Sequence, residues 1–283
     1  MTDVQLNVVT SGNVTWVTKR EIENTFRDCY RRFKIRLPYR VDVHIVDTEA
    51  NVQAILKEEK LRMGITTAGD EEYICYHDAW RGYPRIICCL ERLAGLSKLA
   101  RLGAMRHEAA HSALHGSIEY YIFKIPEECR HIAAVKGLDA SVLDQVLYFL
   151  SVAVKDFEAT RFLVQRNFIE CQFAFALEWI RTSEEDKAVW KLAQASRRGK
   201  FVYLVALLKP VLFAHPLLAL PRSKKVPLEQ QVLLARRVEE LLEHLGTAEQ
   251  NRFLQVANLM VEELTGDTHK NVDVALQQAM NLA

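Results

Sequence analysis

The stretch Arg106–Gly116, with the sequence RHEAAHSALHG, is where side-chain spacing most restricts the structure that this chain can adopt. His107 and His111 are four residues apart, so on an α-helix they lie on one face, one turn above the other. Two neutral imidazoles in that arrangement can bind one zinc ion through their ring nitrogens. Glu108 follows the first histidine, where a carboxylate can accept a proton from a water that the metal activates. The spacing therefore predicts a helix, and a zinc site on it is our first hypothesis.

The residues around this motif favour a buried helix. Ser97 is a suitable N-cap at its start, and Gly116 is a suitable residue for its end. Small residues at Gly103 and Ala104 share the histidine face, where they would let another element approach closely. Apolar residues occupy the other sides as well: Leu99, Leu102, Ala109, Ala110 and Ala113. We therefore expect burial almost all round, and we prefer zinc binding to a purely structural pair of histidines.

The segment His107–Gly116, HEAAHSALHG, resembles the HExxHxxLH signature of the ImmA/IrrE class of intracellular regulatory metallopeptidases. It resembles, less specifically, the HtpX and CAAX-prenyl protease class. The resemblance implies a zincin fold whose third zinc ligand is acidic and lies on a later helix, in a pattern like E-x-x-A-[DN]. Asp156–Phe162, DFEATRF, is similar to that pattern, with Ala159 at its Ala position. Two positions differ, because Asp156 stands in place of Glu and Thr160 in place of Asp or Asn.

Residue types leave several candidates for the third ligand. Helical phase places Asp156 among apolar residues, where an acidic side chain requires a compensating charge such as zinc. The same phase places Glu158 with Arg161 on a polar face, where an ion pair on a solvated surface would explain it. Asp156 is therefore the first choice and Glu158 the second. The remaining candidates are Glu127, Glu128 and His131.

Other side chains near the motif have weaker patterns. His115 lies eight residues after His107 and so leaves the ligand face by about 80°. We interpret His115 as a residue at the C-terminus of the helix, where the macrodipole favours it. Tyr120 and Tyr121, just beyond the helix, are candidates for donating a phenol hydrogen bond to a developing oxyanion.

Charge and cysteine content restrict partners and compartment. Lys and Arg number 37 and Asp and Glu 36, so the formal net charge is +1, and we expect no nucleic acid as partner. The six cysteines show no CxxC pairing, and we expect them to be reduced and mostly buried in a cytoplasmic protein. The N-terminal residues lack a basic segment followed by an apolar one, which favours the same compartment.

The order of predicted elements indicates an α+β fold with a zincin-like N-terminal part that contains a small mixed sheet. Alternating apolar patterns predict strands at 4–9, 39–46, 72–77 and 84–90. Helices are expected at 48–61 and at 18–33, the second beginning with a capping box of Thr18 and Glu21. In such a fold the strand nearest the site has a free edge to which an extended peptide can add. The candidates for that edge are 85–89 and 73–76.

The chain after residue 116 is predicted to be all helical. We divide it into a zincin-like catalytic domain at 1–182 and a helical C-terminal domain or extension at 183–283. The apolar segment Phe201–Leu220 approaches the length of a membrane span, but Lys209, Pro210 and Pro216 interrupt it. We therefore interpret it as separate buried helical segments and expect no membrane association.

Together these features lead to one functional hypothesis and one alternative. The first is a zinc metallopeptidase that binds one Zn²⁺ per chain through His107, His111 and Asp156 and hydrolyses a peptide or protein substrate. Glu108 would be the general base that accepts the proton of the attacking water and passes it to the leaving amine. The alternative keeps the zincin fold but is a catalytically latent regulatory or protein-binding module, which the differences at Asp156 and Thr160 favour.

Overall fold

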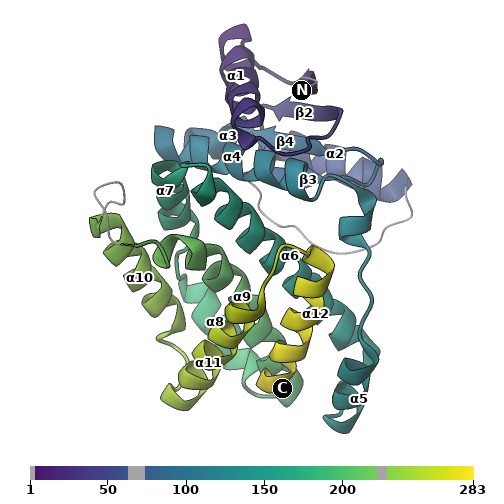
Figure 1. Cartoon of the computed structure of the whole chain (residues 1–283), viewed down its shortest axis with the longest axis vertical. Coiled ribbons are helices and arrows are strands. Elements are labelled where there is room, and N and C mark those ends of the chain that lie inside the picture. Colours follow the sequence, from purple (N-terminus) through teal and green to yellow (C-terminus); the bar gives the residue numbers. More distant parts are fainter. Residues whose placement is uncertain (1–3, 63–73, 222–227) are drawn as a thin grey trace. The chain divides into compact units, whose positions relative to one another are not determined.

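The protein combines one small mixed β-sheet with many helices, as the computed structural model shows for residues 4–62, 74–221 and 228–283 (Figure 1). The predicted α+β class is confirmed. The chain divides into two compact units. The first comprises Met1–Ile118 and Gln165–Phe175, and the second Glu119–Val164 and Ala176–Ala283. The predicted boundary after residue 182 is a different division and stays a prediction.

The sheet of the first unit has the strand order β1-β2-β4-β3. Its strands are β1 (Gln5–Ser11), β2 (Arg40–Val46), β3 (Cys75–Asp78) and β4 (Arg85–Cys89). β1, β2 and β4 run parallel, with Val8 opposite Val43 and Ile45 opposite Cys88. Parallel strands require crossover connections, which the helices α1 (Trp16–Phe33) and α2 (Glu49–Arg62) provide after β1 and β2. β3 pairs antiparallel with β4 and therefore lies at the edge.

The position of β3 decides between the two predicted edge strands. The expectation that 85–89 could be the free edge is wrong, because β4 lies between β2 and β3. All five residues of β4 are buried, as in strands covered on both faces, so its sequence pattern could not reveal its neighbours. The other candidate, 73–76, overlaps β3 from Cys75 onward, whereas its residue 73 lies outside the described residues.

Helix α4 (Lys98–Leu114) carries the HExxH motif and begins as expected. The Oγ of its N-cap, Ser97, accepts a hydrogen bond from the backbone N–H of Ala100 at 3.2 Å. The start of α1 was predicted wrongly, because its N-cap is Thr15, whose Oγ1 accepts from the N–H of Thr18 at 3.1 Å. α1 packs against α4, and the hydroxyls of Tyr30 and Ser112 are 2.6 Å apart in their buried contact.

Gly103 allows the beginning of helix α7 (Ile169–Trp179) to approach α4 closely. A Cβ atom at Gly103 would lie 2.2 Å from the carbonyl oxygen of Cys171 and 2.6 Å from the Cβ of Phe175. The side-chain amide of the buried Gln172 donates to the Gly103 carbonyl at 3.0 Å. The expected close approach of another element at this small residue is therefore confirmed.

The second unit is helical. Its helices are α5 (Glu127–Val135), most of α6 (Ala140–Gln165), α8 (Glu184–Ala193), α9 (Arg197–Leu218), α10 (Leu228–Leu242), α11 (Thr247–Glu263) and α12 (Thr268–Ala279), and a short 3₁₀ turn, η1 (Ile118–Tyr121), leads into it. α9 contacts α8, α10 and α11, and α11 contacts α12. Helix α12 was not predicted, although Asp267 caps it by accepting from the N–H groups of His269 and Lys270.

Helix α9 is continuous, so the expectation of separate segments between Phe201 and Leu220 is wrong. Pro210 and Pro216 both lie inside it. The hydrogen bonds that prolines remove are a local cost, whereas the buried apolar residues on this helix gain from packing along its whole length. Among the described residues, α9 is the helix long and apolar enough to cross a membrane, and 61% of its most apolar window is buried inside the structure.

Gly103 gives a direct test of the packing around α4. We expect Gly103→Ala to lower the free energy of unfolding by about 1–3 kcal/mol, because the new methyl group meets the backbone of α7 and both helices must shift. Gly95→Ala is the matched control, since its nearest new contact is the Arg92 carbonyl oxygen at 3.6 Å. Urea unfolding of both variants measures the difference, and equal stabilities would contradict the close contact at Gly103.

Candidate metal centre

The imidazoles of His107 and His111 converge on a common point. Both are buried on α4, with Nε2 atoms 3.0 Å apart and ring planes nearly perpendicular. Two nitrogens that bind one zinc ion at roughly 2.0–2.1 Å in tetrahedral geometry lie about 3.3 Å apart. The four-residue spacing places both side chains on one face of the helix, and their rotamers bring the two Nε2 atoms together. The predicted pairing of the two histidines on one helix face is therefore present, with donor atoms that suit zinc.

Glu108 lies half-buried on the same helix, on the side close to the edge strand β3. The pKa of the Cys75 thiol on β3 is raised well above its usual value. The hydrogen bond with Cys88 is the largest cause, burial is the second, and the Cys88 and Glu108 charges follow. The carboxylate of Glu108 therefore lies near β3.

His77 is a residue of this site that the sequence analysis missed. It lies on β3, two residues after Cys75, so both side chains point to the same face of the strand. Its ring stacks on that of His111, with centroids 5.9 Å apart and planes 11° from parallel. The alternation of β3 indicates that Cys75 and His77 share a face, but only the packing of β3 on α4 shows which helix that face meets.

His115 is the C-cap residue of α4, as its position near the helix end suggested. The prediction did not include its contact with the motif. His115 is fully buried, and its Nδ1 lies 3.2 Å from the Nδ1 of His111. The same residue thus ends the helix and contacts one of the two converging histidines.

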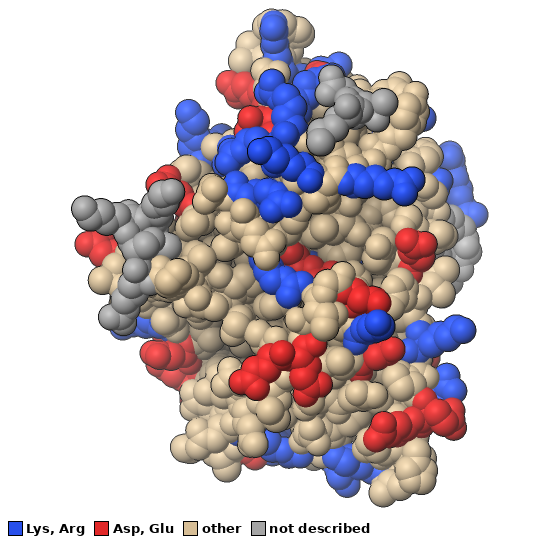
Figure 2. Space-filling model, in the orientation of Figure 1, with Lys and Arg blue, Asp and Glu red and all other residues tan. Residues whose placement is uncertain are grey.

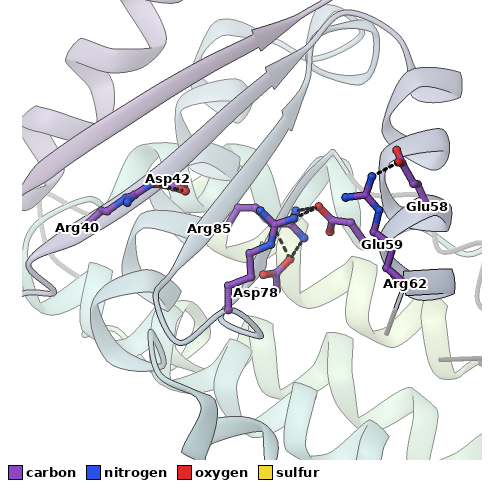
Figure 3. A network of polar contacts seen from close by, with 8 residues as sticks. Arg40, Asp42, Glu58, Glu59, Arg62, Asp78 and Arg85 are labelled. Carbon is purple, nitrogen blue, oxygen red and sulfur yellow. Dashed lines mark hydrogen bonds and ion pairs between the residues drawn. The ribbon is translucent and has the colours of Figure 1, made fainter. Parts of the chain in front are cut away.

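A buried ion network fixes the hairpin that contains β3 (Figure 3). The guanidinium of Arg85 on β4 donates to the carboxylate of Asp78 on β3 and, at 2.6 Å, to Glu59 on α2. Glu59 also accepts from Arg81 at 2.5 Å. Burial raises the pKa of the Asp78 carboxyl, and the charge of Arg85 opposes that shift. These contacts lie on the face of β3 opposite to Cys75 and His77, so they hold the strand without occupying its α4 side.

The two acidic candidates on α6 are both buried, Asp156 with 8% and Glu158 with 7% of its surface exposed. The prediction of a solvated face for Glu158 is therefore wrong. Every residue from 153 to 160 is buried, so helical phase does not separate the two positions. The Glu158 carboxylate accepts hydrogen bonds from Thr268 Oγ1 at 2.8 Å and from Asn271 Nδ2 at 2.5 Å. These partners come from α12, which the sequence analysis did not foresee.

The other predicted candidates belong to the second unit and have other contacts. Glu127, Glu128 and His131 are exposed on α5, where an interior metal ligand is not expected. The ammonium of Lys155 lies over the ring of Tyr121 in a cation–π contact, 4.3 Å from the ring centroid. Tyr120 contacts the ring of His269. Burial lowers the pKa of Lys155 to about 8, and the charges of Asp156 and Glu158 oppose that shift.

Acidic and basic side chains both occur on the face of the molecule drawn in Figure 2, in keeping with totals of 36 and 37. Comparison with known proteins identifies no relative: no family model, no curated protein and no solved structure matches the chain. The likeness of HEAAHSALHG and DFEATRF to two short motifs therefore remains a resemblance.

From the Arg85 network we predict that removing a buried ion pair lowers the free energy of unfolding much more than removing an exposed one. We expect Asp78→Ala to lower the free energy of unfolding by about 3–5 kcal/mol, because Arg85 stays buried without its main counter-charge. The control is Arg62→Ala, which removes the exposed Glu58–Arg62 pair (Figure 3) and should change stability by at most about 0.5 kcal/mol. Urea unfolding measures both, and a similar small loss in each variant would contradict a buried network.

Proposed function

We propose that this protein is a zinc-dependent metallopeptidase with a zincin-like fold, and that His107, His111 and Asp156 bind its metal. The observation that carries the proposal is the convergence of two Nε2 atoms, 3.0 Å apart, on a buried helix. His107 and His111 supply two buried imidazoles, and Asp156 would supply a buried carboxylate as the third ligand. Two imidazoles and one carboxylate are a donor set that catalytic zinc sites use, with one position open for water.

Asp156 is preferred to Glu158 as the third ligand because hydrogen-bond donors already engage the Glu158 carboxylate. Both oxygens of Glu158 accept hydrogen bonds from neutral donors of the same unit, which explains its burial without a metal. A divalent cation bound to Asp156 would stabilise the charged form of its buried carboxylate. Aspartate reaches one methylene less far than the glutamate that the similar motif carries.

The chain supplies the remaining groups for hydrolysis of a peptide bond. When bound, zinc would supply a Lewis acid that polarises a carbonyl and lowers the pKa of a water towards neutrality. Glu108 would accept a proton from the attacking water and deliver it to the leaving amine. β3 pairs with β4 on one side, and within the described ranges no strand pairs with its other side. An extended peptide that adds there would pass Glu108 and the two histidines of α4.

We propose a cytoplasmic setting, and the cysteines support it. All six are free and buried, which supports the reduced state expected in the cytoplasm. A peptide or protein is the proposed substrate. The alternative is a catalytically latent module that keeps the zincin fold and has a regulatory or protein-binding role.

Glu108→Gln tests the proposed function. We expect native mass spectrometry to find one zinc per chain in the wild type and in Glu108→Gln. The double variant with His107→Ala and His111→Ala should contain none. Cleavage of a fluorogenic peptide library should fall by at least about 100-fold in Glu108→Gln, because an amide cannot accept the proton. Glu119→Gln, which alters an exposed glutamate just beyond α4, is the control and should retain full activity. Zinc without any cleavage by the wild type would support the latent module instead.

Variants of α6 test the third ligand. Asp156→Ala should weaken zinc binding by much more than the roughly 10–100-fold typical of residues that only support a ligand. Asp156→Glu should keep zinc with altered affinity, since only the reach of the carboxylate changes. Glu158→Ala should keep zinc affinity but lower the free energy of unfolding by about 1–3 kcal/mol, because two buried donors lose their acceptor. Chelator competition and urea unfolding measure the two effects. Zinc loss in Glu158→Ala alone would show that Glu158 is the ligand.

A further inference from the structure

His111 contacts one histidine through each of its ring nitrogens, and both partners lie on its own helix. Its Nε2 is 3.0 Å from the Nε2 of His107, one turn before it. Its Nδ1 is 3.2 Å from the Nδ1 of His115, one turn after it. The centroids of the His111 and His115 rings are 5.4 Å apart, and His115 has no solvent-exposed surface.

The number of protons on each imidazole links the two contacts of His111. An N–H···N hydrogen bond holds one proton, and a neutral imidazole carries one proton on only one of its two nitrogens. A histidine that binds zinc through Nε2 must have a bare Nε2, so its proton is on Nδ1. In His111 that Nδ1–H points at the Nδ1 of His115, which can accept it when the proton of His115 is on Nε2.

We propose that His115 is a positioning residue for His111, and the inference rests on the zinc site proposed above. The Nδ1 of His115 accepts the Nδ1–H of His111, which keeps the Nε2 of His111 available for the metal and fixes the angle of its ring. Histidines that bind metals donate their second N–H to a carboxylate, a carbonyl or a water. In this chain an imidazole from the next turn of the same helix takes that role.

The backbone at the end of α4 supports this role. The N–H of His115 donates to the carbonyl of His111 at 2.7 Å, so main chain and side chain of His115 both contact the same residue. His115 has φ −126° and ψ 27°, outside the helical range, which ends the helix at this position. On β3, the ring of His77 stacks in parallel on His111. The ring of His111 is thus restrained by neighbours on its helix and on the adjacent strand.

Two substitutions of His115 separate hydrogen bonding from packing. His115→Asn places an amide oxygen near the position of Nδ1 and keeps an acceptor, whereas His115→Leu fills similar space without one. Ser112→Ala is the control, because it removes the buried contact with Tyr30 from the same helix without touching a histidine. Zinc affinity is measured by competition with a chromophoric chelator, ligand geometry by the absorption spectrum of the cobalt-substituted protein, and folding by thermal unfolding in EDTA.

We expect His115→Leu to bind zinc about 10–100-fold more weakly and His115→Asn to stay within about threefold of the wild type. The cobalt spectrum should change in His115→Leu and be unchanged in Ser112→Ala. In the zinc-loaded wild type, ¹⁵N NMR should find the His111 proton on Nδ1, a measurement that needs no variant to fold.

Three results would overturn the role of His115 and leave the zinc site in place. They are wild-type affinity and spectrum in His115→Leu, equal weakening by the Asn and Leu variants, or a His111 proton on Nε2. Failure of the wild type to bind zinc would instead overturn the metallopeptidase proposal and this inference together.

Discussion

The close burial of α4 is the constraint on which the rest of the first unit depends. Gly103 lets α7 approach the helix to within backbone contact, and Tyr30 of α1 contacts Ser112 on another part of it. Protein interiors are packed about as densely as organic crystals, so side chains between such neighbours have little room to move. Helical spacing places His107 and His111 on one face of α4. The elements packed around the helix then restrict how far their rings can move.

Buried charged side chains in this protein are stabilised in two ways, by opposite charges or by neutral hydrogen-bond donors. Arg85 lies among opposite charges, Asp78 and Glu59, on the α2 side of the sheet. Glu158 lies among neutral donors, Thr268 and Asn271, that satisfy both of its oxygens. Each arrangement lowers the cost of removing a charge from water, and each explains the burial of its residue without a further ligand. Burial by itself is therefore a poor guide to a metal ligand, and the identity of the contacting groups is a better one.

The edge strand links the sheet to the proposed chemistry. β3 carries Cys75 and His77 on the face near α4, while Asp78 on its other face binds Arg85. Alternation along the strand keeps these two roles apart. The ion network can hold the hairpin in register. Its side chains are on the opposite face of β3 from Cys75 and His77, which face α4. His115 extends the same arrangement along the helix, since it contacts His111 from the turn that follows the motif.

Local features of the fold could be predicted from the sequence. These include the α4 helix with its Ser97 cap, the four-residue spacing of His107 and His111, and the approximate positions of the strands. Such features depend on residues within one or two turns, whose geometry the backbone dictates. Tertiary structure decided that β3 and not β4 is the edge, that α9 runs through its two prolines, and that Glu158 is buried against α12. Those outcomes depend on groups far away in the sequence, because a strand's neighbour or a carboxylate's donor is set by the path of the whole chain.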